Sequence, residues 1–423
     1  MPKAFRTFRL PNGVGVYVRE TTRFKTVYLR ATLQAPLDDD TSLSALLPFV
    51  LKRGTTRHPN VLAMTRYLEE LYGALFDIDV AKIGERLVVS FRLEVIDPGY
   101  LPTGGPDVVV EALDFLRDVI FHPVVNDRGH LDTDYVRQER ENLVEMVDSL
   151  FDNRPHYALE RCIEEMCGDE PFGRYEYGTV EALKAIRPPG LTRHWQHLLD
   201  TAPLDLYVVG RVDAVQLERS IRERFGRAGR HAGPLPRATR RPAPARPRRV
   251  EDRADLQQSR VVLGYRCNAG FETRQWPALA VMNAIFGGIT TSKLFQAVRE
   301  RESLAYSVNS FLEKEKGILF VTAGISAKSV KKFEAIVKEE LEQLRRGEIT
   351  ADELRNAKNH LEDQLRGVED SPGTLTLFDL ERRLAGRLET PEQAAAEIAQ
   401  VTRGAIAEAA RGVQLDTIYL LRE

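Results

Sequence analysis

The stretch that decides the fold is residues 283–308, NAIFGGITTSKLFQAVRERESLAYSV. It combines the paired glycines Gly287 and Gly288 with an S-x-L-F run, an R-E pair that begins at Arg299, and an L-A-Y run that ends at Tyr306. An arginine fork and a phenol are hydrogen-bond donors suited to a peptide carbonyl and its developing oxyanion. For the two residues in isolation, the preferred interpretation is a solvated helix residue for Arg299 and a strand residue at the edge of a core for Tyr306. The glycines lack the spacing of a phosphate-binding loop, which argues against that function.

The pattern of paired glycines, S-x-L-F, R-E and L-A-Y resembles that of the pitrilysin/insulinase family of zinc peptidases, which includes the mitochondrial processing peptidases. The resemblance covers nearly the whole chain and is strongest over residues 283–308. It implies that Arg299 and Tyr306 face a zinc site and hold the substrate, with the tyrosine helping to polarise the scissile carbonyl. It also places Gly287 and Gly288 in the substrate-binding segment. Residues 157–178 resemble a bacterial, catalytically degenerate branch of the same family.

A second stretch, residues 44–55 (SALLPFVLKRGT), resembles the active-site helix of that family without its active site. In the family, an inverted zinc motif H-x-x-E-H lies on a helix that runs into Lys-Gly-Thr. The ending is present here as Arg53-Gly54-Thr55, but the three motif positions fall on Ala45, Pro48 and Phe49. A catalytic zinc needs N, O or S ligands, and hydrolysis needs a carboxylate to accept a proton from the bound water. These three side chains offer neither.

The third zinc ligand of the family is a glutamate on a later helix, and its position falls on Met146, or on Glu145 if the alignment shifts by one. A single carboxylate does not make a zinc site. The resemblance therefore implies no catalytic residue and no metal ligand in this chain. Pro48 also argues against a regular helix, because proline costs about 3 kcal/mol in a helix interior. The plainer interpretation is a buried helix with an apolar stripe formed by Leu43, Leu46, Leu47, Val50 and Leu51.

The 423 residues include 43% hydrophobic and 29% charged residues, which predicts a globular protein with at least two domains. The formal net charge of −2 gives no overall bias toward nucleic acid or anionic membrane. The first residues show no apolar signal region and no segment is long enough to span a bilayer, so we expect a cytoplasmic protein. Three cysteines do not make a disulfide framework, and Cys162 and Cys167 are predicted to be buried thiols.

The rest of the sequence indicates neither a replacement metal site nor a hydrolase motif. His194 and His197 are spaced i, i+3, but no acid or cysteine at ligand spacing accompanies them. We therefore expect two partly exposed helix residues. His58 is predicted to lie in a loop. A G-x-S-x-G nucleophile elbow is absent.

The organisation predicted is two α+β halves joined by a linker. Residues 227–252 are rich in proline, arginine and small residues, without an apolar period, and separate residues 1–226 from 253–423. Each half ends in a similar strand, 204–210 and 415–421. Hairpins are predicted at Asn12-Gly13, Gly84 and Lys316-Gly317, and a capping box at Thr350 and Glu353. Hairpins mixed with long helices indicate antiparallel sheets, each covered on one face by helices. The family resemblance implies two such halves arranged like a clam.

The resulting hypothesis is a non-catalytic subunit of a heterodimeric zinc peptidase. Its partner would be a related chain with an intact H-x-x-E-H motif and the zinc, and its substrate a peptide or small unfolded protein. One alternative is a peptidase active alone through a non-standard metal set, such as Glu145 with a histidine brought in by the fold. The other is a structural or peptide-binding module. The basic linker could meet an acidic surface, but it lacks aromatic residues for stacking on nucleic acid, so a solvated tether is expected.

Overall fold

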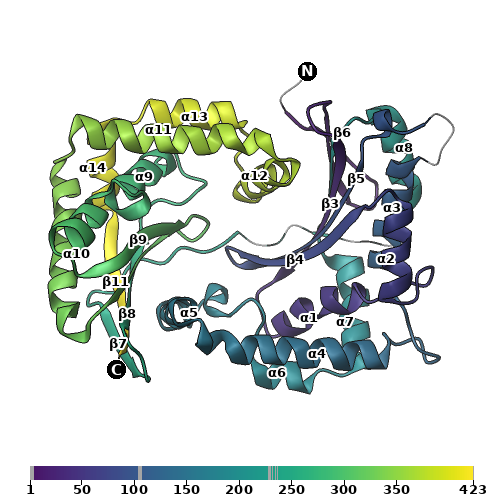
Figure 1. Cartoon of the computed structure of the whole chain (residues 1–423), viewed down its shortest axis with the longest axis horizontal. Coiled ribbons are helices and arrows are strands. Elements are labelled where there is room, and N and C mark those ends of the chain that lie inside the picture. The colour runs from purple at the N-terminus through teal and green to yellow at the C-terminus, as the bar shows by residue number, and fades with distance from the viewer. Residues whose placement is uncertain are drawn as a thin grey trace. The chain divides into compact units, whose positions relative to one another are not determined.

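The computed structural model describes residues 4–102, 107–226, 230, 232–233, 235 and 237–422. The chain forms two compact units, each built around one sheet (Figure 1). The first unit consists of Met1–Asp148, Tyr175–Pro236 and Pro372–Leu377, and the second of Ser149–Arg174, Arg237–Ser371 and Phe378–Glu423. Both units mix strands and helices, which confirms the predicted α+β class.

Within the described residues, the first unit holds a six-stranded sheet of order β1-β2-β6-β3-β5-β4. Its strands are β1 (Arg6–Arg9), β2 (Gly15–Glu20), β3 (Thr26–Pro36), β4 (Leu75–Ile83), β5 (Arg86–Ile96) and β6 (Leu204–Gly210). The hairpins predicted at Asn12-Gly13 and Gly84 are confirmed, because β1 pairs with β2 and β4 with β5 in antiparallel register. Gly13 and Gly84 both have positive φ, which glycine adopts without strain.

The helices of the first unit cover one face of this sheet. They are α1 (Thr41–Leu51), α2 (Val61–Glu70), α3 (Val108–Phe121), α4 (Thr133–Asp148), α6 (Val180–Ala185), α7 (Pro188–Thr201) and α8 (Ala214–Phe225). Alternate residues of β3, such as Leu29, Ala31 and Leu33, point into the core that the helices close. In Figure 1, α3 and α8 lie on that side of β3 and β5.

The second unit holds a five-stranded sheet of order β7-β11-β8-β10-β9 among the described residues. Its strands are β7 (Arg248–Arg253), β8 (Ser259–Cys267), β9 (Ala305–Glu313), β10 (Ile318–Ile325) and β11 (Val413–Arg422). Its helices are α5 (Arg154–Cys167), α9 (Trp276–Asn283), α10 (Val330–Arg346), α11 (Ala351–Gly367), α12 (Pro372–Ala385, shared with the first unit), α13 (Pro391–Ala399) and α14 (Arg403–Arg411). The hairpin at Lys316-Gly317 and the capping box of Thr350 and Glu353 are confirmed.

Two features of the sheets differ from the prediction. Each sheet includes a parallel pair, β2 with β6 and β7 with β11, because the closing strand returns through a long crossover. The second sheet is covered on both faces: α10 and α14 lie on one side and α5 on the other (Figure 1). Met166 of α5 packs over Gly264 of β8, where an added Cβ would lie 2.7 Å from the Met166 Sδ.

Part of the predicted linker is a strand. Residues 227–229, 231, 234 and 236 lie outside the described residues, but Arg248–Arg253 form β7, which pairs with β11. This edge strand carries charged residues and buries no alternate apolar set, so it has no apolar period to detect. Two arginines of the predicted linker are paired rather than solvated, since Arg240 pairs with Glu272 at 2.5 Å and Arg249, within β7, pairs with Glu334 at 2.8 Å. The remaining domain boundaries stay predictions.

A buried charge cluster fastens α5 and its following turn to the second sheet. The Glu170 carboxylate accepts hydrogen bonds from Arg266 Nη2 at 2.6 Å and from Lys316 Nζ at 2.6 Å. Arg266 Nε donates to Asp416 at 3.0 Å. The side chains of Glu170 and Lys316 are 1% and 0% exposed. Lys316 lies in the β9–β10 turn, so this cluster joins segments far apart in the sequence.

The cysteines are three buried free thiols, as predicted for Cys162 and Cys167. Burial raises the pKa of Cys167 and of Cys267 to about 12, so both are protonated at neutral pH. Among the described residues, no helix combines the length and the apolar character needed to cross a bilayer.

Candidate functional site

The helix at the degenerate zinc position is regular despite its proline. α1 runs from Thr41 to Leu51 with Pro48 inside, and Lys52 N donates to Pro48 O at 3.0 Å. The prediction that Pro48 argues against a regular helix is therefore wrong. Leu46, Leu47, Val50 and Leu51 are buried as predicted, and this packing outweighs the intrinsic cost of proline.

The side chains at the three positions of the inverted zinc motif carry no metal-binding atoms. Ala45 and Pro48 are buried and Phe49 is half-buried. Met146, on α4, is 40% exposed, and Glu145 beside it is also exposed. No group of three or more His, Cys, Asp or Glu side chains is arranged to hold a metal ion in the part of the chain that the structure describes.

The retained Arg53-Gly54-Thr55 ending has a structural function of its own. Arg53 pairs with Glu139 of α4 at 3.2 Å, donates to Gln138 at 2.6 Å, and lies 5.4 Å from the ring centroid of Tyr135. A Cβ on Gly54 would lie 2.7 Å from the backbone oxygen of Pro59. These contacts hold the end of α1 against α4 whether or not a metal is present.

His194 differs from its prediction, because it is buried rather than partly exposed. It lies on α7 with its Nε2 2.8 Å from the Ser44 Oγ of α1, and its Nδ1 3.9 Å from an Asp40 carboxylate oxygen. This resembles a Ser-His-Asp arrangement, but Ser44 is only 1% exposed and cannot meet a substrate. The three residues therefore join α1 to α7. His197 is exposed, and His58 lies in a loop, both as predicted.

We expect His194 to make the stability of the first unit pH-dependent. Burial lowers the pKa of His194 in the folded chain, whereas the unfolded chain keeps an ordinary value near 6.5. Its contribution is therefore complete above about pH 6.5, and is lost at up to about 1.4 kcal/mol per pH unit as the pH falls toward the folded pKa. Urea unfolding of a Trp276→Phe background, with Trp195 as reporter, measures this at pH 7.5 and 5.5.

His194→Gln keeps a hydrogen-bonding side chain beside Ser44 but cannot titrate, so it should show a smaller fall in stability between the two pH values. His197→Gln is the matched control, because His197 is exposed. An equal fall in the parent and in His194→Gln would contradict this assignment.

The second unit brings Arg299 and Tyr306 together. The Arg299 guanidinium carbon lies 5.0 Å from the Tyr306 ring centroid and 4.8 Å from that of Phe295. Tyr306 is 83% exposed, and the Arg299 side chain is 39% exposed. Tyr306 belongs to β9, which lies at the edge of its sheet opposite to β7. The two predicted donors are thus adjacent and accessible.

Phe295 is a member of this group that sequence reasoning missed. It begins a π-helical segment, η5 (Phe295–Arg301), and stacks against Arg299 one turn later. The aromatic residue of the S-x-L-F run was the available signal. π-helical turns occur frequently at functional sites. Ser303, with φ +50°, lies between the end of this segment at Arg301 and the start of β9 at Ala305.

Gly287 and Gly288 allow close packing. They end a second π-helical segment, η4 (Ala284–Gly288), which lies against β9. A Cβ on Gly287 would lie 2.7 Å from the Ser310 Oγ, and one on Gly288 would lie 3.0 Å from the Asn283 Nδ2. Their geometry is explained by this packing, and a role in substrate binding stays a prediction.

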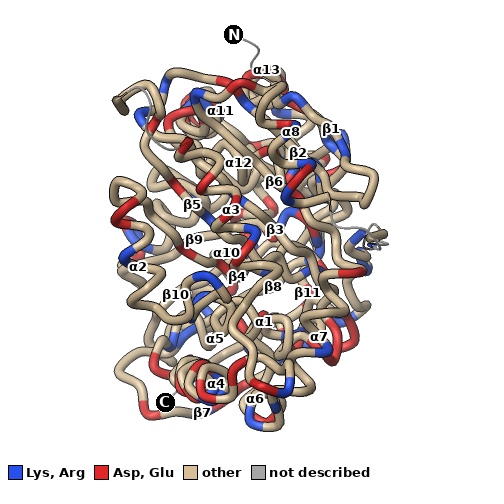
Figure 2. The backbone as a smooth tube through the Cα atoms, turned by 90° about the vertical axis from the view of Figure 1, so that its right-hand side faces the viewer, with Lys and Arg blue, Asp and Glu red and all other residues tan. Residues whose placement is uncertain are grey.

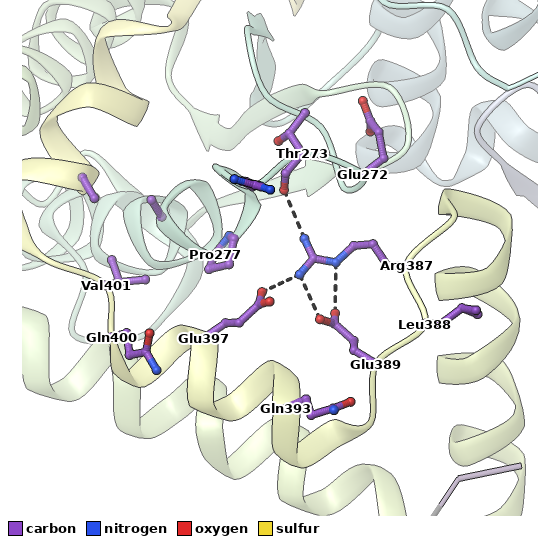
Figure 3. A pocket seen from close by; sticks show the side chains of 13 residues that line it. Glu272, Thr273, Pro277, Arg387, Leu388, Glu389, Gln393, Glu397, Gln400 and Val401 are labelled. Atoms are coloured by element: carbon purple, nitrogen blue, oxygen red, sulfur yellow. Dashed lines mark hydrogen bonds and ion pairs between the residues drawn. The ribbon is translucent and has the colours of Figure 1, made fainter.

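The second unit also has a cavity of about 800 Å³ beside α9 and α13 (Figure 3). Arg387 lines it, donates to the Thr273 carbonyl at 3.1 Å, and pairs with Glu389 and Glu397. These contacts satisfy the Arg387 guanidinium within the protein, so Arg387 offers no unpaired charge to a ligand in the cavity. Lys, Arg, Asp and Glu are likewise intermixed along the backbone in Figure 2.

Comparisons with known proteins point to the same family as the sequence motifs do. Residues 194–361 match the model of the Peptidase M16 inactive domain. The chain is 33% identical to the Bacillus subtilis protein described as "Probable inactive metalloprotease YmfF", over 97% of this chain and 96% of that protein. It is 28% identical to an uncharacterized zinc protease of Streptomyces coelicolor, over 71% of this chain and 66% of that protein. The chain belongs to the peptidase M16 family, the pitrilysin/insulinase family, and lacks that family's zinc motif.

A solved structure supports the same fold. A conserved protein from Enterococcus faecalis V583 superposes with a TM-score of 0.92 at 27% identity, over 99% of this chain and 98% of that one. A peptidase M16 inactive domain from Pseudomonas fluorescens gives a TM-score of 0.79 at 16% identity, over 99% of this chain and 98% of that one, which indicates a shared fold alone.

Proposed function

We propose that this chain is the non-catalytic subunit of a heterodimeric zinc metallopeptidase, in which Arg299 and Tyr306 bind the peptide substrate at the partner's zinc site. The observation that carries the proposal is the adjacency of these two exposed donors in a family member whose own zinc positions are Ala45, Pro48 and Phe49.

The geometry suits binding and polarisation of a carbonyl. Arg299 lies within cation–π distance of the Phe295 and Tyr306 rings, which restricts its rotamers. Its Nε lies 3.5 Å from a Glu300 carboxylate oxygen, which leaves the Nη hydrogens for a ligand. The Tyr306 hydroxyl belongs to a side chain that is mostly in solvent, so a bound carbonyl can reach it. Donors placed in advance stabilise the charge that develops on the carbonyl oxygen.

This chemistry needs a metal from elsewhere. Hydrolysis requires an activated water, and Ala45, Pro48 and Phe49 cannot bind the ion that would supply it. A homodimer would repeat this deficiency, so the partner is a related chain with H-x-x-E-H, acting with this subunit on peptides or small unfolded proteins in the cytoplasm. The description of the Bacillus subtilis relative as a probable inactive metalloprotease supports the absence of activity in the isolated chain.

The experiment that tests the proposal is native mass spectrometry, with zinc quantified, on the tagged chain purified from its own host. We expect a one-to-one complex with a related chain and one zinc, and no zinc when this chain is produced alone. One zinc on the isolated chain would favour a peptidase active by itself. A metal-free monomer or homodimer from the host would favour a structural or peptide-binding module.

A further inference from the structure

A smaller cavity in the second unit, unrelated to Arg299 and Tyr306, has the features of an anion site. Its volume is about 370 Å³, at the lower end of the range for small-molecule sites. It lies between the end of α5, residues 241–248, and strands β8 and β11. Its lining is mostly polar and includes Arg241, Arg246 and Arg266.

The base of this cavity contains a buried arginine with an unused donor. Arg266 is 5% exposed. Its Nε and Nη2 donate to Asp416 and Glu170, but its Nη1 is shielded from solvent and has no hydrogen-bond partner. Because a water molecule does not reach this nitrogen, it does not face the open cavity, so Arg266 forms part of the wall rather than a contact for a ligand.

The rim carries positive charge that the protein does not neutralise. Arg241 is exposed and donates to the backbone oxygen of Asp169, which carries no charge. Arg246 is exposed, and among the described residues it makes no hydrogen bond or ion pair. Other arginines nearby do pair with carboxylates, as Arg248 does with Glu165 at 3.3 Å.

The carboxylates around the cavity do not cancel this excess. Glu170 and Asp416 are matched by Arg266 and Lys316, which gives two charges of each sign. After these pairs and the Arg248–Glu165 pair, the Asp169 carboxylate remains to balance the positive charges of Arg241 and Arg246. The rim therefore keeps about one net positive charge.

We propose that this cavity binds a small organic oxyanion, a carboxylate or a phosphate, between Arg241 and Arg246 at its rim. Arginine forks match both kinds of oxyanion. Pro242 and Pro244 fix the backbone of the rim segment, and with Met166 they provide apolar surface for the rest of the ligand. The proposal does not depend on a partner subunit or on peptide hydrolysis.

The test is thermal unfolding of the purified full-length chain in inorganic phosphate or acetate, with sodium chloride at equal ionic strength as reference. We expect one of these probes to raise the Tm in a saturable way, by about 3–6 °C at ten times its Kd. The probe that does so identifies the preferred oxyanion. Arg246→Gln is expected to weaken binding at least about tenfold, and Arg241→Gln with Arg246→Gln to abolish it.

Arg274→Gln is the matched control, because Arg274 is an exposed arginine of the same unit that lines the other cavity. It should keep the full response, as should Tyr306→Phe. The rim variants avoid Arg266, whose loss would disrupt the buried charge cluster. A Tm rise that chloride reproduces, no rise with either probe, or an unchanged response in the double rim variant would overturn the proposal.

Discussion

Replacing Glu170 with alanine is expected to lower the free energy of unfolding of the second unit by about 3–5 kcal/mol. The Glu170 carboxylate accepts from both Arg266 and Lys316, and all three side chains are at least 95% buried. Its removal leaves two cations in the interior with only Asp416 as a counter-charge. Because the cluster joins the turn after α5 to β8 and to the β9–β10 turn, the packing of α5 on the sheet should weaken with it.

The sequence provides a control one residue away. Asp169 is exposed and its side chain makes no hydrogen bond or ion pair among the described residues, so Asp169→Ala should change stability by no more than about 0.5 kcal/mol. Urea unfolding of a Trp195→Phe background leaves Trp276 as the fluorescence reporter of the second unit. Equal midpoints for Glu170→Ala and Asp169→Ala would show that the cluster does not stabilise this unit.

The predictions that held were those with a local cause. Asn12-Gly13 turns a hairpin because both residues suit a tight turn, and Thr350 with Glu353 caps α11 within four residues of sequence. The family resemblance assigned Arg299 and Tyr306 to substrate binding, which stays a prediction; the structure shows that the two side chains, which come from different elements, are adjacent.

The features that sequence did not predict depend on distant partners. α1 continues through Pro48 because surrounding apolar residues bury it. His194 is buried against α1, where it forms a hydrogen bond with Ser44, which lies 150 residues away in the sequence. The Glu170–Lys316 contact spans 146 positions, and no local pattern marks either residue. Propensity and periodicity describe single elements, so they do not reveal which elements meet.

If the proposed heterodimer forms, Arg299→Ala and Tyr306→Phe are each expected to lower its kcat by about 10²–10³-fold while leaving its assembly intact. Tyr306→Phe keeps the ring beside Arg299 and removes only the hydroxyl, so its loss of rate reports the hydrogen bond to the substrate rather than packing. Arg299→Lys keeps the charge but loses the planar fork, and should retain only part of the activity.

Arg301→Ala is the control for these variants. Arg301 lies in the same π-helical segment, is 65% exposed, and pairs with Glu340 at 2.7 Å, away from the Phe295–Arg299–Tyr306 stack. Peptide hydrolysis, with kcat and KM measured separately, and native mass spectrometry of each variant distinguish catalysis from assembly. If Arg299→Ala and Tyr306→Phe turn over as fast as Arg301→Ala, the two donors do not act on the substrate. If they lose rate at unchanged stoichiometry, this subunit contributes to the chemistry of a zinc site it does not itself possess.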